Sequence, residues 1–215
     1  MSRRESDAVT DSGLPVGGSP LQQRLAAAAV ELFYRQGAIA TSVRQITEAC
    51  GLTPGALYNH FESKDELLYT VVRDIHLRLE SALTAAVAAV AGDPVAELSA
   101  IVRVYVARHS DHRETARVAN REFPLLTGAH YDEVVAIRRR LRDTMVDVLL
   151  AGQKKQIFDL VGGDDRTAAV LTALPILDMC VHISEWFHEH RPLSHAELEA
   201  RYVGLALRMA GARTH

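Results

Sequence analysis

Residues 37–61 read GAIATSVRQITEACGLTPGALYNHF, and they carry the most specific structural pattern in the chain. It predicts a short helix over 43–50 that begins after Ser42, because a serine hydroxyl suits the N-terminus of a helix. Gly51 ends this helix, since glycine readily adopts the backbone angles of a tight turn. A second short helix is expected over 53–60. Two short helices joined by a tight glycine turn have the shape of a helix-turn-helix unit.

The residue types of this unit suit an approach to DNA. Gly55 and Ala56 leave the leading face of the second helix slim enough to reach base edges in the major groove. Thr53 is expected to be the N-cap of this helix and, like Ser42, to offer a hydroxyl to phosphate oxygens. Asn59 suits either a base edge or a phosphate. Donors for the flanking DNA backbone are expected from Tyr58, His60 and Lys64.

The rest of the chain predicts an all-α protein. It has 215 residues, of which 48% are hydrophobic and 24% charged, as in soluble globular proteins of one or two domains. Apolar residues recur at spacings of three and four, and no alternating strand pattern bounded by hairpin turns occurs. The further helices are expected over 21–36, 63–91, 94–109, 113–123, 130–156, 166–190 and 195–211.

Several classes of function are disfavoured by the sequence. It contains no uninterrupted apolar stretch of membrane-spanning length and no signal-peptide pattern, so a cytoplasmic protein with no membrane partner is expected. Cys50 and Cys180 lie too far apart in the sequence for a cysteine-rich zinc site. Glu185 and His188 form one Glu-x-x-His unit, but the second copy needed by di-iron bundles is missing. His188, Glu189, His190 and His195 are interpreted as an exposed helix end, so no catalytic residue, metal or cofactor is expected.

The charge balance of the helix-turn-helix region is neutral. The net charge of the whole chain is −3, and residues 21–73 carry as many acidic as basic side chains. Affinity for DNA usually depends on basic side chains that neutralise phosphates. Binding is therefore expected to use neutral donors and helix N-termini as well, with only a moderate dependence on salt.

The run TSVRQITEACGLTPGALYNHFESKDEL, residues 41–67, resembles the N-terminal domain of the tetracycline-repressor (TetR) family of bacterial transcription regulators. The resemblance extends over about residues 21–68. It implies a DNA-binding domain over 20–66 and a ligand-binding and dimerisation domain over 67–215, after a tail over 1–19 whose glycine, proline and charged residues predict flexibility. It also implies DNA-facing positions. Phosphates would be contacted by Thr41, Ser42 and Arg44, the groove by Thr53, Pro54, Gly55, Ala56 and Asn59, and the backbone by Tyr58, His60 and Lys64.

The second half of the chain offers candidates for a ligand pocket. Asp178 and His182 lie one helical turn apart and suit either a pocket or a subunit seam. The arginine-rich run 138–142 is either an anion site, for example for a coenzyme A thioester, or a solvated helix face. The pocket candidates are Tyr105, His109, Arg121, Phe123, Asp178, His182 and Trp186.

The expected helix over 166–190 is apolar nearly all round, which indicates that both of its faces are covered. With the apolar stripe of the last helix it predicts a four-helix dimer interface, as the resemblance also implies. Pro175 predicts a kink in it. The interface candidates are Leu174, Val181, Leu198, Tyr202, Leu205 and Met209.

These features together predict a homodimeric, ligand-responsive regulator, most simply a repressor that a small effector releases from a palindromic operator in double-stranded DNA. The effector is expected to be either a largely apolar drug or metabolite, as in regulators of efflux, or an acyl-coenzyme A thioester. Two other classes stay open at this point: an enzyme on a helical bundle, and an interaction module that does not bind DNA.

Overall fold

The computed structural model describes residues 17–163, 165–188 and 193–212, so the expected tail over 1–19 lies almost wholly outside the described residues. Within these ranges all regular elements are helical, as predicted. The helices are α1 (Pro20–Gln36), α2 (Val43–Ala49), α3 (Gly55–Tyr58), α4 (Lys64–Ala88), α5 (Pro94–Asp111), α6 (Arg113–Glu122), the 3-10 helix η1 (Phe123–Leu125), α7 (Gly128–Lys154), α8 (Arg166–Val181), α9 (Ile183–Trp186) and α10 (His195–Met209).

The helix ends follow the capping residues. Ser42 is the N-cap of α2: its hydroxyl accepts from the Gln45 backbone N–H, and the Gln45 side chain accepts from the Ser42 N–H in return. Ser63 starts α4 in the same way by accepting from the Glu66 backbone N–H. Gly37 ends α1 with a φ of 82°, a conformation that favours glycine. These caps confirm the predicted end of α1 and the predicted starts of α2 and α4.

Two predicted helices are corrected by the structure. The helix expected over 53–60 is only the single turn of α3, and the Thr53 hydroxyl caps nothing; the Thr53 carbonyl instead accepts from the Ala56 N–H in a turn. The helix expected over 166–190 is interrupted at His182 and ends at Trp186. In the short α9, the Ser184 hydroxyl donates a hydrogen bond to the Val181 carbonyl. Phe187 follows in an extended conformation and is buried.

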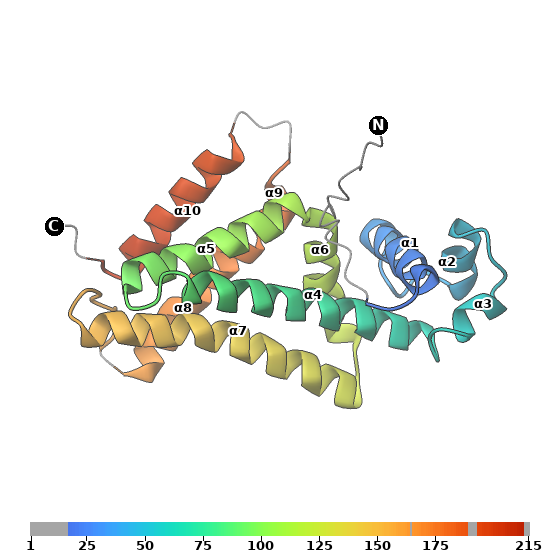
Figure 1. Cartoon of the computed structure of the whole chain (residues 1–215), viewed down its shortest axis with the longest axis horizontal. Coiled ribbons are helices and arrows are strands. Elements are labelled where there is room, and N and C mark those ends of the chain that lie inside the picture. Colours follow the sequence, from blue (N-terminus) through green and yellow to red (C-terminus); the bar gives the residue numbers. More distant parts are fainter. Residues whose placement is uncertain (1–16, 164, 189–192, 213–215) are drawn as a thin grey trace, which may run out of the picture.

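The elements form two packed groups linked by α4 (Figure 1). At one end, α1, α2 and α3 pack together around the fully buried Leu25, Phe33, Ile46 and Leu57. The N-terminal half of α4 shares this core up to Val72, and α6 and α7 each contribute a valine to it. At the other end, α5 packs against α4, α7, α8 and α10, and α7 packs against α4 and α8 as well. The long α4 therefore belongs to both cores, and α7 contributes to both as well.

The α8–α9 stretch, Arg166–Trp186, is long and apolar enough to cross a membrane by length and composition alone, with a mean hydropathy of 1.6. A core helix of a soluble protein passes the same test. Here Ala169, Ala173, Ile176 and Cys180 are fully buried on one side of α8, in the larger core. Pro175 lies inside α8, which is helical on both sides of it. One side of the stretch thus packs within the protein, whereas Leu171 and Leu174 of α8 are exposed.

Candidate functional site

The outer face of α2 and α3 presents most of the predicted DNA-facing residues to solvent. Gly55 is exposed, and a Cβ placed on it would meet no atom within 4 Å. Tyr58 is 57% exposed although it is a large aromatic residue, whereas Leu57 beside it is buried in the core. Ala56 and His60 are half-buried. The other exposed candidates are Ser42, Arg44, Thr53, Pro54 and Asn59.

Two predicted phosphate contacts are occupied within the fold. Thr41 is 1% exposed, and its hydroxyl donates to the Gly37 carbonyl 2.8 Å away. The Lys64 ammonium donates to the carbonyls of Ala38 and Thr41 at 2.7 and 2.9 Å. Thr41 and Lys64 therefore fix the loop between α1 and α2 against the start of α4, and their side chains hold the position of the neighbouring Ser42 and Arg44.

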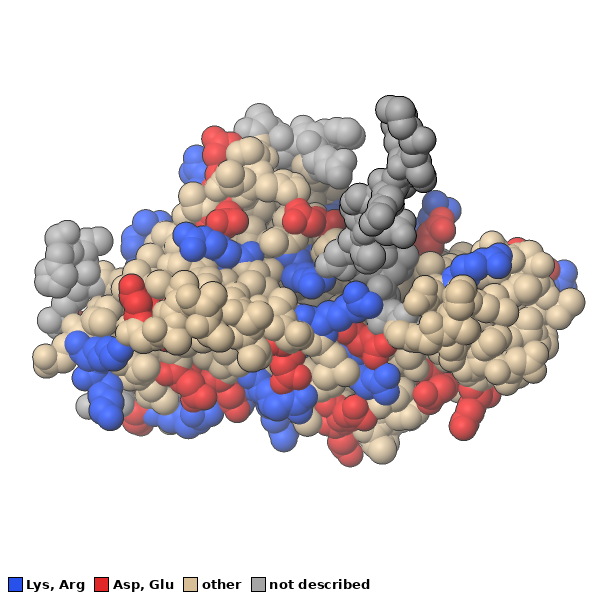
Figure 2. Space-filling view, viewed as in Figure 1, with Lys and Arg blue, Asp and Glu red and all other residues tan. Residues whose placement is uncertain are grey.

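The charges near this surface are balanced. The Arg44 guanidinium pairs with Glu48 one turn along α2, at 2.6 Å between Nε and Oε1, and both side chains are exposed. The pKa of Arg44 is raised by this hydrogen bond and by the charge of Glu48. Figure 2 shows that the side of the α1–α3 end visible there is mostly neither acidic nor basic. A phosphate has to compete with Glu48 for Arg44.

The second candidate site is a cavity of about 340 Å³ in the helical part of the chain. Such a volume fits a small organic ligand. Its walls come from α4, α5, α6, η1, α7 and α8. Among the α7 residues that line it, Tyr131 and Arg139 are exposed. The lining residues that carry most of the chemistry are His76, Tyr105, His109, Asn120, Phe123, Arg138, Arg139, Arg142 and Asp178.

A chain of hydrogen bonds forms one wall of this cavity. The Arg138 Nη1 lies 3.0 Å from the His76 Nε2 and 3.1 Å from the Asn120 Oδ1. The Asn120 amide nitrogen lies 3.3 Å from the His109 Nε2. Each histidine places its Nδ1 2.8 Å from the carbonyl of the residue four positions earlier. Because Nδ1 faces an acceptor in each ring, both histidines are best described as neutral, with Nε2 accepting from Arg138 or Asn120.

Burial keeps these histidines neutral. The pKa of His76 and that of His109 are each lowered to about 4, chiefly by desolvation and further by the charge of Arg138. Burial also lowers the pKa of Arg138 itself, and it raises that of Tyr105. The Phe123 ring lies under the Arg138 guanidinium, 4.3 Å from its centroid to Cζ. The wall therefore holds one buried cation among neutral groups.

The structure brings four of the seven pocket candidates into the cavity lining: Tyr105, His109, Phe123 and Asp178. The remaining three lie outside that lining. His182 is exposed, Trp186 stacks on Tyr202 of α10, and Arg121 is paired with a carboxylate. Sequence reasoning missed His76 and Asn120 as lining residues. A signal existed for His76, because it is a polar residue on the apolar stripe of α4.

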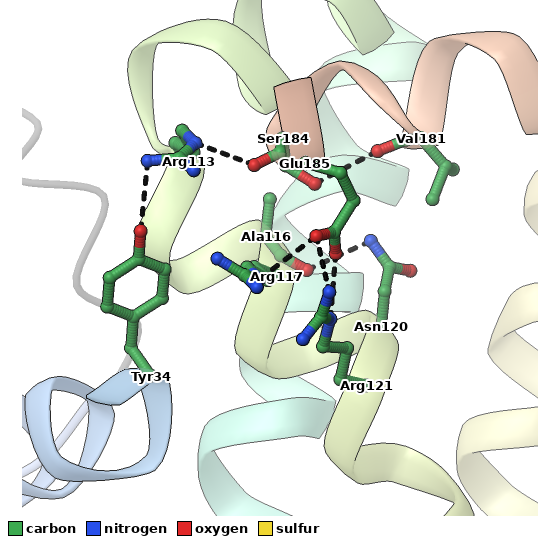
Figure 3. Close-up of polar contacts among 9 residues, drawn as sticks. All are labelled: Tyr34, Arg113, Ala116, Arg117, Asn120, Arg121, Val181, Ser184 and Glu185. Atoms are coloured by element: carbon green, nitrogen blue, oxygen red, sulfur yellow. Dashed lines mark hydrogen bonds and ion pairs between the residues drawn. The ribbon is translucent and has the colours of Figure 1, made fainter. Parts of the chain in front are cut away.

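The α6 helix connects the α9 side of the cavity domain to α1 (Figure 3). Glu185 of α9 accepts from Arg121 Nε at 2.8 Å and pairs with Arg117 at 3.1 Å, both on α6. At the other end of α6, Arg113 donates to the Ser184 carbonyl at 2.7 Å and to the Tyr34 hydroxyl of α1 at 2.9 Å. The α6 helix therefore contacts both α9 and the DNA-binding end of the chain.

The predicted interface residues fall into three groups. Leu174 on α8 and Leu205 on α10 are 45% and 41% exposed, and Leu171 beside them on α8 is 62% exposed. Val181, Tyr202 and Met209 are half-buried. Leu198 is 1% exposed in the core of the chain itself, so it offers almost no surface to a partner. Leu174 and Val181 also line the cavity, which places this face and the cavity next to each other.

The predicted absence of a metal site rests on the histidines near Pro192, and Glu189 and His190 lie outside the described residues. Elsewhere in the described ranges no group of three or more histidine, cysteine or acidic side chains is close enough to hold a metal ion. His195 instead pairs with Asp111 at 2.7 Å.

Comparisons with known proteins agree with this architecture. The family model described as "Bacterial regulatory proteins, tetR family" matches residues 25–71, and "Tetracyclin repressor-like, C-terminal domain" matches residues 91–210, which is more than half of the chain. The first match covers the helix-turn-helix, and the second covers most of the residues that line the cavity.

Three known proteins are similar over most of their length. The transcriptional repressor KstR2 of Rhodococcus jostii RHA1 is 29% identical over 147 residues, which cover 66% of this chain and 70% of KstR2. A tetR-family regulatory protein from Rhodococcus RHA1 has a solved structure with a TM-score of 0.82 at 31% identity, covering 92% of this chain and all (100%) of that one. AibR, solved with isovaleryl coenzyme A and operator DNA, has a TM-score of 0.78 at 20% identity, covering 89% of this chain and 99% of AibR.

A helix-turn-helix joined to a helical domain with a ligand-sized cavity defines a DNA-binding transcriptional regulator rather than an enzyme. The chain belongs to the TetR family of bacterial regulators. This membership excludes the helical-bundle enzyme considered from the sequence.

Proposed function

We propose that this chain is a homodimeric repressor that an acyl-coenzyme A thioester releases from a palindromic operator. The observation that carries the choice of effector is the set of arginines along α7 at the cavity, namely Arg138, Arg139 and Arg142. AibR, solved with isovaleryl coenzyme A and operator DNA, has a similar fold and supports the proposal. Because the partner is DNA, the site of action is the cytoplasm.

The DNA-binding half of the proposal rests on α2 and α3. The exposed Gly55, Tyr58 and Asn59 lie on the single turn that follows the Gly51 turn, so this turn enters the major groove. Ser42 and Arg44 lie at the start of α2 and contact phosphates beside the groove. A two-fold dimer presents this unit twice, and the operator therefore has two inverted half-sites.

The cavity favours a thioester over an uncharged drug. Its apolar lining includes Leu79, Leu141 and Leu177, which suit the acyl part. Arg139 is exposed and pairs with no described residue, and Arg142 pairs only with the adjacent Asp143, at 2.8 Å. Cations at the exposed side suit the phosphates of coenzyme A. Charged groups at this position would disfavour a neutral apolar drug, since burying them against an apolar ligand costs free energy.

The dimer in this proposal forms through α8 and α10. The exposed Leu171 and Leu174 on α8 and Leu205 on α10 are apolar side chains that a monomer leaves in water. Joining two copies of this face makes a four-helix seam and covers these leucines. Since Leu174 and Val181 also line the cavity, an effector that moves α8 alters the seam as well.

The route of the response is the α6 helix. Effector in the cavity contacts Asn120 and Phe123 at the end of α6. The other end of α6 holds Tyr34 of α1 through Arg113. An effector that prefers one position of α6 therefore shifts the population of dimers toward a spacing of the two α3 helices that fits the operator poorly.

The test is selection from a random pool of DNA duplexes on the purified full-length protein, followed by release with hexanoyl-coenzyme A. Enrichment of a palindrome that the thioester releases supports the proposal. A folded dimer that enriches no sequence would sink the DNA-binding half. An enriched palindrome that apolar drugs release and acyl thioesters do not would favour the sensor of drugs or metabolites instead.

A further inference from the structure

Arg138 uses only one side of its guanidinium group within the protein. Its Nη1 lies 3.0 Å from the His76 ring nitrogen and 3.1 Å from the Asn120 amide oxygen, and these two contacts take both of the Nη1 protons. The Nε and Nη2 nitrogens donate to no described residue. Three N–H groups on one guanidinium are thus left without an acceptor in a side chain that lines the cavity.

The charge of Arg138 is also left without a counter-ion. It forms no ion pair with any described carboxylate. The charge of Asp178, which lines the cavity from α8, opposes the lowering of the Arg138 pKa by burial, but the two side chains do not pair. The groups that do contact Arg138 are neutral: the His76 ring, the Asn120 amide and the Phe123 ring, 4.3 Å from Cζ. Since an unpaired buried charge destabilises a folded protein, such a charge at a ligand site indicates a ligand that supplies the opposite charge.

Arg138 and Arg139 lie at different depths and define two regions that can each bind an anion. Arg139 is exposed at the rim, whereas Arg138 is largely buried against the hydrogen-bonded wall. The phosphates of coenzyme A are too large and too strongly hydrated for the wall, and they suit the rim. The acyl group is the part of a thioester that reaches the wall.

We propose that the effector carries a carboxylate at the far end of its acyl group, and that the Nε–Nη2 edge of Arg138 binds this carboxylate in a bidentate pair. This inference rests on the proposed acyl-thioester function and narrows its ligand class to coenzyme A monothioesters of dicarboxylic acids. The bidentate geometry is the one in which a guanidinium and a carboxylate match best. The contacts of Nη1 with His76 and Asn120 hold the plane of the group in advance of binding.

The test compares matched pairs of thioesters by isothermal titration calorimetry on the full-length protein. Each pair has the same acyl length with and without a terminal carboxylate: glutaryl- against valeryl-, adipoyl- against hexanoyl-, and pimeloyl- against heptanoyl-coenzyme A. Three lengths are used so that the reach of the chain does not decide the result. In the length that fits, the dicarboxylic member is expected to bind at least about tenfold more tightly, because a charged bidentate pair replaces an unpaired cation.

Two variants locate the preference. Arg138→Gln is expected to abolish the difference between the members of each pair. Arg139→Gln, the matched control at the rim, is expected to weaken both members by the same factor. Unfolding curves confirm that each variant is folded, and the wild-type comparison stands without either variant.

The outcomes separate this inference from the proposed function. Equal binding of both members at all three lengths, or a carboxylate preference that persists in Arg138→Gln, would overturn the inference and leave the acyl-thioester proposal in place. Failure of every thioester to bind would overturn the proposed effector class, and this inference with it.

Discussion

The helix-turn-helix and the cavity differ in how the chain encodes them. The candidate DNA-facing residues all come from one continuous stretch, residues 41–64, in which caps, a glycine turn and spacing are local features. The cavity draws its lining from six elements between His76 and Val181. A surface formed by residues that are neighbours in the sequence can therefore be predicted from their spacing. A cavity formed by packing depends instead on which helix faces meet.

The largest expected effect concerns the surface of α3. Gly55→Trp adds a bulky ring at an exposed position where an added Cβ meets no atom within 4 Å, so we expect the fold to accept it and the DNA groove to exclude it. We expect loss of specific operator binding by at least about a thousandfold, down to the level of non-specific DNA, with an unchanged unfolding transition. Fluorescence anisotropy with an operator duplex measures the first effect and calorimetry the second.

Ala85→Trp is the matched control for this change, since it adds the same ring at an exposed position far along α4. It is expected to leave operator binding intact. Wild-type affinity in Gly55→Trp would show that α3 does not enter the groove, and the contrast between the two regions would then lose its functional meaning.

The next effect lies in the cavity wall and appears on acidification. The pKa values of His76 and His109 are each about 4 in the folded protein, below the usual value of 6.5, so the unfolded chain takes up protons first as the pH falls. Stability is thus fully present above pH 6.5 and is lost toward pH 4, by roughly 3 kcal/mol for each histidine. Urea unfolding at a series of pH values measures the slope.

Replacing one of these histidines sharpens that prediction. His76→Gln removes one of the two titrating groups and is expected to make the stability of the protein less dependent on pH, whatever its effect at neutral pH. An unchanged slope in both His76→Gln and His109→Gln would show that the acid sensitivity arises elsewhere.

A smaller effect distinguishes structure from DNA contact at the start of α4. Lys64→Met removes two hydrogen bonds from an ammonium to the carbonyls of Ala38 and Thr41, and we expect it to cost about 2 kcal/mol of unfolding free energy. Arg44→Met removes an exposed side chain, and it is expected to weaken operator binding with little change in stability. A Lys64→Met variant that weakens operator binding and keeps its stability would mean that Lys64 binds a DNA phosphate and does not hydrogen-bond the loop in solution.

The smallest effect tests the link between the two regions. Glu185→Gln weakens the pairing of α9 with Arg117 and Arg121 of α6, and it is expected to lower stability by about 1 kcal/mol and to reduce the effect of effector on operator affinity. Glu199→Gln breaks a comparable pair with Arg103, between α10 and α5, away from α6. The account requires that only the first variant weakens the coupling.

Most of the helical fold could be predicted because its determinants are local. Ser42 and Ser63 cap α2 and α4 as their hydroxyls suggested, and Gly37 and Gly51 end helices as expected. The exceptions arise from tertiary contacts. The sequence predicts a helix that continues to residue 190, but the helix ends at Trp186, where Phe187 turns to an extended conformation and is buried.

The site could be predicted only in part, and the reason is the same. The polar residues of the cavity wall come together through the packing of α4, α5, α6 and α7, so the sequence did not reveal that Asn120 bridges Arg138 and His109. Similarly, Lys64 could be placed near DNA by spacing, but not its hydrogen bonds to the loop after α1. Local patterns identify which groups are present; packing decides what each one contacts.

The proposed function requires that a ligand in the cavity lowers the affinity of the protein for its operator. The most direct measurement is the affinity of the full-length dimer for its selected operator, by fluorescence anisotropy, with and without saturating adipoyl-coenzyme A. We expect the thioester to raise the dissociation constant of the operator complex at least about tenfold, which corresponds to a coupling free energy of ~1.4 kcal/mol. An operator affinity that stays the same while calorimetry shows the cavity occupied would contradict it.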